Sequence, residues 1–111
     1  MLIIILQVIL ALGFLMFGWM KFTSEDMVKG FDHFGLPQWF RVVTGIVEWA
    51  GALLLIAGIW VTPLATIGAT LLAITMAGAI LTHIRAKDPL TGSIMPLVLM
   101  LLNVVVVINL I

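Results

Sequence analysis

The feature that most constrains this chain is a succession of four apolar runs, each about as long as a membrane-crossing helix. The runs cover approximately residues 2–20, 39–61, 63–83 and 93–111. A spanning helix needs roughly 20 apolar residues, and only helices and closed barrels satisfy their backbone groups in lipid. The sequence therefore predicts an all-α fold: one four-transmembrane-helix bundle over residues 1–111, with a short interfacial helix between helices 1 and 2.

Composition agrees with this class and excludes others. Apolar residues make up 64% of the chain and charged residues 9%, whereas about a quarter of an ordinary soluble domain is charged. Five acidic residues balance five basic ones, so no net charge favours a nucleic-acid partner. The chain has no cysteine, which excludes disulfides and thiol redox chemistry. The expected partner is the lipid bilayer.

The polar segment after the first run predicts a short amphipathic helix. Thr23 or Ser24 can cap it, and its first turn holds two acids, which the helix dipole favours. Apolar residues recur at spacings of three and four: Met27, Val28, Phe31 and Phe34. Gly35 and Pro37 supply a stop signal. We expect a connecting helix in the membrane interface, and a lid over a site is the alternative.

The basic side chains indicate an orientation in the bacterial cytoplasmic membrane. All of them belong to one end of the expected bundle: Lys21, Lys29, Arg41, Arg85 and Lys87. Because basic residues favour the inner side, both charged loops are expected in the cytoplasm and both termini outside. The first run lacks the basic residues that precede a cleaved signal peptide, so we expect a retained first helix.

Glu48 is the most informative residue of the apolar runs. It lies about 13 Å along its helix from Trp39, at about 1.5 Å per residue. An ionisable group at such depth costs several kcal/mol unless it is paired or hydrated, and so suggests a functional site. Gly45 and Gly51 share its face and allow close helix contact. Glu48 is therefore expected to face the bundle, either as a site residue or as a helix-packing hydrogen bond.

Three basic residues could reach Glu48 from the same end of the bundle. Lys21 ends the first run, Arg41 lies two turns from Glu48, and His83 ends the third run. The hypothesis is a polar pocket in which Lys21, Arg41, Glu48 and His83 bind a ligand. Glu48 and His83 would carry proton chemistry there, since histidine suits proton transfer near neutral pH. Singly, Lys21 and Arg41 are also typical snorkelling anchors.

Other residues are expected to act structurally. They share small size or a fixed backbone angle: Gly18, Gly35, Pro37, Gly45, Gly51 and Pro63. Pro63 suits the first turn of the third helix, and the Asn103 amide could bridge helices. The two histidines lack metal-ligand spacing, so no metal is expected.

The residues also resemble a known family. The segments GFLMFGWMKF, FDHFGLPQWF and GIVEWAGALLLIAGIWVTPLA, with a histidine closing the third helix, are similar to the DoxX-like family of small bacterial membrane proteins. The likeness spans residues 10 to about 85. The positions that match the family's pattern are Gly18, Lys21, Gly35, Leu36, Pro37, Glu48, Gly51 and His83. The resemblance implies a four-helix fold and, for several members, association with quinone-linked oxidoreductase systems or oxidative stress.

Three functions follow as hypotheses. The first is a membrane subunit or accessory of a quinone-linked redox or oxidative-stress system, with a quinone or another small amphipathic ligand near Glu48. The second is a non-enzymatic scaffold that holds a soluble oxidoreductase through residues 21–40 and 85–92. The third is a homo-oligomeric carrier of small solutes or lipids. Whether the chain is itself an enzyme, and which cofactor it uses, stays open, with quinone as the candidate.

Overall fold

The computed structural model describes residues 2–87 and 93–111, which form five α-helices and no strand. Three helices are long: α1 (Leu2–Thr23), α3 (Gln38–Ala57) and α4 (Thr62–Arg85). A short helix, α2 (Glu25–His33), connects α1 to α3, and α5 (Ile94–Leu110) completes the fold. The prediction of an all-α chain is confirmed.

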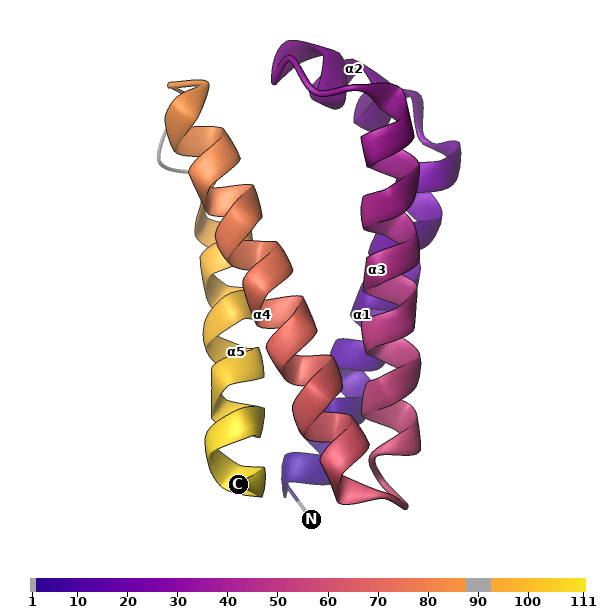
Figure 1. The fold of residues 1–111 in the computed structure, drawn as a ribbon, viewed down its shortest axis with the longest axis vertical. Coiled ribbons are helices and arrows are strands. Elements are labelled where there is room, and N and C mark those ends of the chain that lie inside the picture. The colour runs from indigo at the N-terminus through magenta and orange to yellow at the C-terminus, as the bar shows by residue number, and fades with distance from the viewer. Residues whose placement is uncertain (1, 88–92) are drawn as a thin grey trace.

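The helices form two pairs that meet at one end of the molecule. α1 packs along α3, α4 packs along α5, and α3 also contacts α4. Figure 1 shows the pairs close together near both termini and the α3–α4 turn, and further apart near α2. The molecule measures 40 × 25 × 17 Å, so its long axis is comparable to a bilayer of about 40–45 Å including headgroups.

Three of the helices in the described residues are long and apolar enough to cross a membrane: α1, α3 and α4. α5 is apolar but has only 17 residues. Large apolar side chains cover the outer surface, as at Ile46, Leu53 and Leu81, which are each more than half exposed. Such a surface suits lipid and not water. The chain is a helical membrane protein.

Small residues bring the helices into close contact. A Cβ at Gly45 would lie 2.7 Å from the Phe22 ring of α1, and one at Gly51 would lie 2.6 Å from Leu72 of α4. A Cβ at Gly18 would clash with Trp49 of α3. Without a hydrophobic force between helices in lipid, this close van der Waals packing holds the bundle together.

Two buried amides add polar contacts to the core. Gln7 is buried in α1 and donates from Nε2 to the Leu55 carbonyl of α3 at 3.1 Å. Asn103, which was expected to bridge helices, instead donates from Nδ2 to Leu99 in its own helix at 2.8 Å. Of these two buried amides, Gln7 is therefore the one that joins two helices.

The end of α2 fixes how the chain turns into α3. Gly35 adopts a positive φ of 71°, which suits glycine because it has no Cβ. Its amide donates to Asp32 at 3.0 Å, and the amide of Leu36 donates to Phe31 at 2.9 Å, the pattern of a Schellman cap. Ser24 occupies the N-cap position of α2, but its side chain makes no capping hydrogen bond.

Helix ends differ from the predicted bounds by three residues or more in two places. α1 continues through Lys21 to Thr23, and α3 ends at Ala57, four residues before the apolar run does. Gly58 follows α3 and packs directly against Ala65, so the chain reverses there while staying apolar. Residues 88–92 of the predicted loop 85–92 lie outside the described residues.

Candidate functional site

A cavity of about 520 Å³ lies at the α2 end of the molecule. All five helices contribute to its wall, from residue 17 in α1 to residue 99 in α5. α2 contributes Met27 and Phe31, and the residues after it contribute Phe34 and Leu36. The volume falls in the range of about 300–1,000 Å³ that is common for small-molecule sites.

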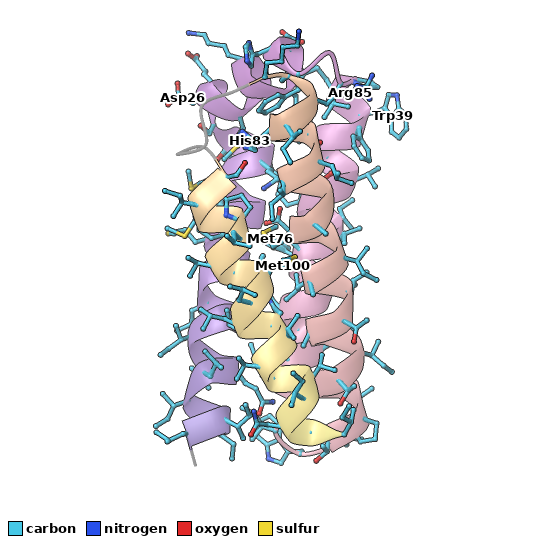
Figure 2. The ribbon with its side chains drawn as sticks, turned by 90° about the vertical axis from the view of Figure 1, so that its left-hand side faces the viewer. Asp26, Trp39, Met76, His83, Arg85 and Met100 are labelled. Carbon is cyan, nitrogen blue, oxygen red and sulfur yellow. The ribbon has the colours of Figure 1, made fainter. Side chains whose placement is uncertain are left out.

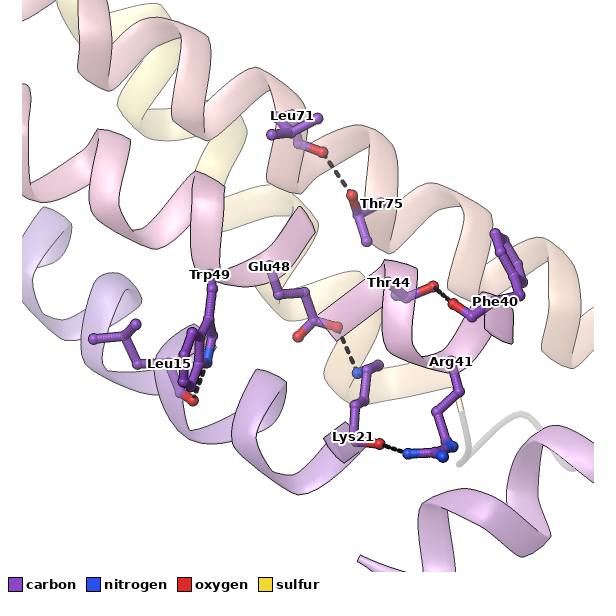
Figure 3. Close-up of polar contacts among 9 residues, drawn as sticks. All are labelled: Leu15, Lys21, Phe40, Arg41, Thr44, Glu48, Trp49, Leu71 and Thr75. Carbon is purple, nitrogen blue, oxygen red and sulfur yellow. Dashed lines mark hydrogen bonds and ion pairs between the residues drawn. The ribbon is translucent and has the colours of Figure 1, made fainter. Parts of the chain in front are cut away.

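The cavity wall contains a buried ion pair. The Lys21 ammonium of α1 lies 2.5 Å from Oε1 of Glu48 in α3 (Figure 3). The Glu48 side chain is fully buried and that of Lys21 is 14% exposed. Both residues line the cavity. Because α1 continues one turn further than predicted, Lys21 is held on a helix against α3, where its charge balances that of Glu48.

Arg41 does not line the cavity. Its Nη1 donates to the main-chain carbonyl of Lys21, and its Nε donates to Oε1 of Gln38 at 2.8 Å. Gln38 in turn donates to the Val28 carbonyl and the Asp32 carboxylate of α2, at 3.0 and 2.8 Å. Arg41 and Gln38 therefore tie α1, α2 and α3 together. Of the predicted polar cluster, Lys21, Glu48 and His83 share the cavity and Arg41 lies beside it.

His83 contributes to the cavity from α4. Its ring meets the Phe34 ring edge-on, with 4.9 Å between centroids. Phe34 caps the C-terminus of α2, so this contact joins α2 to α4. Figure 2 shows His83 near the α2 end of α4, with Met76 further along the same helix toward the centre.

Most of the remaining wall is formed by apolar side chains. It is rich in aromatic rings and methionines: Phe17, Phe31, Phe34, Phe40, Met27, Met76 and Met95. Methionine adapts to irregular shapes and contacts aromatic rings favourably. Nothing in the sequence spacing of the methionines marks a cavity. The spacing of Phe31 and Phe34 on the apolar face of α2 was the available signal.

Three threonines also line the cavity, but their hydroxyl protons are used inside their own helices. Thr44 donates to Phe40 at 2.8 Å, Thr75 to Leu71 at 2.8 Å and Thr82 to Gly78 at 2.9 Å. Within the part of the chain that the structure describes, no three His, Cys, Asp or Glu side chains gather to hold a metal ion.

The fold and this cavity define a class: a small helical membrane protein with an apolar cavity that contains one buried Lys–Glu pair. Comparison with known sequences gives the family. The profile of the DoxX-like family matches residues 5–106, and the chain belongs to that family, as the sequence motifs predicted.

A curated relative supports this membership along the whole chain. It is the uncharacterised protein YdgD of Bacillus subtilis (strain 168), which is 36% identical over an alignment 110 residues long that covers 96% of each chain. No solved structure matches this chain.

Proposed function

We propose that the chain is the membrane subunit or accessory of a quinone-linked redox or oxidative-stress system. In this proposal the cavity binds a quinone or another small amphipathic ligand. The observation that carries it is the fully buried carboxylate of Glu48 on the wall of an otherwise apolar cavity. A charge is costly to bury, and buried ionisable groups in membrane helices are typically functional.

The chemistry of the wall fits an amphipathic ligand. The phenylalanine rings and methionines provide a soft apolar surface for a ring or chain, and Lys21 and Glu48 provide one polar end. Pockets of this kind combine a mainly apolar lining with a few polar groups that orient the ligand. Glu48 and His83 are the groups that would exchange protons with it, from α3 and α4.

Blocking the cavity should remove the ligand, and the chain offers a matched control. Gly78 lines the cavity, and a Cβ there would have open space around it; the same is true of Gly13, which lies outside the cavity. We expect protein purified in lipid nanodiscs to retain a small molecule detectable by mass spectrometry. Gly78→Leu should lower the retained amount at least about fivefold, because the leucine fills the space that the ligand needs.

Gly13→Leu should leave the retained amount unchanged. If both variants retain the same molecule at wild-type amounts, the cavity is not the binding site. If wild-type protein retains nothing and binds no added quinone or amphiphile, the proposed function is wrong.

A scaffold function is the second candidate. The exposed face of α2 carries Glu25, Asp26, Lys29 and Asp32, and it could hold a soluble oxidoreductase at the membrane. Capture of such an enzyme by wild-type protein, and its loss after Lys29→Glu, would favour this candidate. A scaffold function would leave the buried Lys21–Glu48 pair with a structural role only.

We further propose that α5 is a fourth span and that α2 lies in the interface. All basic side chains of the described residues lie toward the α2 end of the helices, so that end is proposed to face the cytoplasm. The cysteine-free chain allows single-cysteine labelling in intact cells. An impermeant reagent should label a cysteine at Thr62 and spare one at Lys29 or Lys87. The reverse pattern would show that the orientation is inverted.

A further inference from the structure

One oxygen of the buried carboxylate has neither an ion-pair partner nor a hydrogen-bond donor among the described residues. Oε1 of Glu48 pairs with Lys21, while Oε2 is buried and receives no hydrogen bond within residues 2–87 and 93–111. Buried polar atoms are paired in the large majority of cases, and an exception needs an explanation. Here the unpaired oxygen belongs to a side chain that lines a 520 Å³ cavity, so a ligand in that cavity is the candidate partner.

The neighbouring donors are committed elsewhere. The Lys21 ammonium contacts Oε1, the Arg41 guanidinium donates to Lys21 and Gln38, and the Trp49 indole donates to the Leu15 carbonyl at 2.8 Å. The three cavity threonines donate within their own helices. Oε2 is therefore an acceptor that the donors of the described residues leave unpaired, on a side chain that lines the cavity.

From this geometry we propose that the cavity selects neutral amphiphiles whose polar end carries a hydroxyl donor. Ligands of the same shape whose polar end only accepts hydrogen bonds should bind less well. This rests on the proposed function and narrows its ligand class. Of a quinone and its quinol, the quinol is the form with hydroxyl donors, so the cavity prefers the reduced form.

A hydrogen bond to Glu48 contributes more to ligand affinity than a hydrogen bond to Lys21. An accepting ligand could bond to the Lys21 ammonium, but that side chain is partly exposed and already paired. A donating ligand bonds to Oε2, which is buried and has no other partner within the described residues. Satisfying a buried charged acceptor that has no partner contributes more than adding a bond to a donor that is already paired. A cationic donor is disfavoured, because the Lys21 ammonium lies beside the same carboxylate and like charges repel.

The test uses two probes that differ only at the polar end. Para-nonylphenol has a hydroxyl group, and para-nonylanisole carries a methoxy group in its place. Their binding is measured by isothermal titration into nanodiscs, and the signal of Gly78→Leu nanodiscs is subtracted to remove partitioning into lipid. We expect wild-type protein to bind the phenol roughly ten- to hundredfold more tightly, as for a hydrogen bond to a charged group.

Two variants assign the preference to Glu48. Glu48→Gln replaces the charged acceptor with an amide, and the preference should fall to within about threefold. Glu25→Gln makes the same change at an exposed carboxylate outside the cavity and should keep the full preference. A preference that survives Glu48→Gln would overturn the inference.

The outcomes separate this inference from the proposed function. Equal binding of both probes by wild-type protein, with loss of both in Gly78→Leu, overturns the donor preference and leaves the cavity as a binding site. If neither probe binds in a Gly78-dependent way, both proposals are wrong. The wild-type comparison alone decides the donor preference, so the inference stays testable even where Glu48→Gln fails to fold.

Discussion

Replacing Lys21 by methionine should lower the free energy of unfolding by about 3–5 kcal/mol. Methionine keeps the length and apolar stem of lysine but removes the ammonium that lies 2.5 Å from Oε1 of Glu48. The carboxylate would then be buried without a counter-charge, which is the costly state for a broken buried pair. Titration of detergent-solubilised protein with a denaturing detergent, followed by helical circular dichroism, measures the loss.

The matched control is Lys29→Met, because Lys29 is exposed on α2. Substitutions at such surface positions change stability by no more than about 0.5 kcal/mol. If Lys21→Met costs no more than Lys29→Met, the pair does not hold α1 against α3.

A double variant separates the structural from the functional role of the pair. Lys21→Met combined with Glu48→Leu replaces both charges with apolar groups, and such replacements are often neutral or stabilising. The double variant should therefore recover most of the stability that Lys21→Met loses, yet bind no cavity ligand. Full ligand binding by a stable double variant would contradict the site hypothesis and leave the pair as a packing device.

Adding a single methyl group should have opposite effects at two glycines. Gly68 of α4 is buried, and a Cβ there would lie 2.8 Å from the Gly51 carbonyl oxygen and 2.8 Å from Cβ of Leu54. Because the backbone of α3 cannot yield, Gly68→Ala should destabilise the protein by about 1–3 kcal/mol. Gly13→Ala meets nothing within 4 Å and should stabilise α1 by up to about 1 kcal/mol, as helix propensity predicts.

Thermal unfolding of both variants in the same detergent gives the comparison. A rise in stability for Gly68→Ala would mean that α3 and α4 are further apart than in this structure. Equal changes at both glycines would mean that α3 and α4 are packed too loosely for one added methyl group to destabilise the protein.

The sequence predicted the helical class well because lipid leaves few alternatives. Each apolar run must satisfy its own backbone, so hydropathy alone indicates the helices. It did not locate their ends, since the reversal after Ala57 is as apolar as the helix before it. There the close approach of Gly58 to Ala65 decides the turn, and a contact between two helices is not visible in a local pattern.

The candidate site could also be predicted only in part. Placing Lys21, Glu48 and His83 at one end followed from counting residues along helices, and the structure brings all three to one cavity. The direction of Arg41 did not follow, because a long side chain chooses among several acceptors, here the Lys21 carbonyl and Gln38. The contribution of α5 to the cavity wall could not be predicted either, because Met95 and Leu99 are apolar like the rest of that helix.

The cavity occupies only one half of the molecule. Its wall uses α2, the last turns of α1 and α4 and the first turns of α3 and α5, and none of the described lining residues comes from the half that contains both termini. A molecule dissolved in the bilayer would therefore reach the cavity from a single leaflet, the inner one in the proposed orientation. The protein would sample that leaflet alone, and the rate at which a ligand crosses between leaflets would limit its supply.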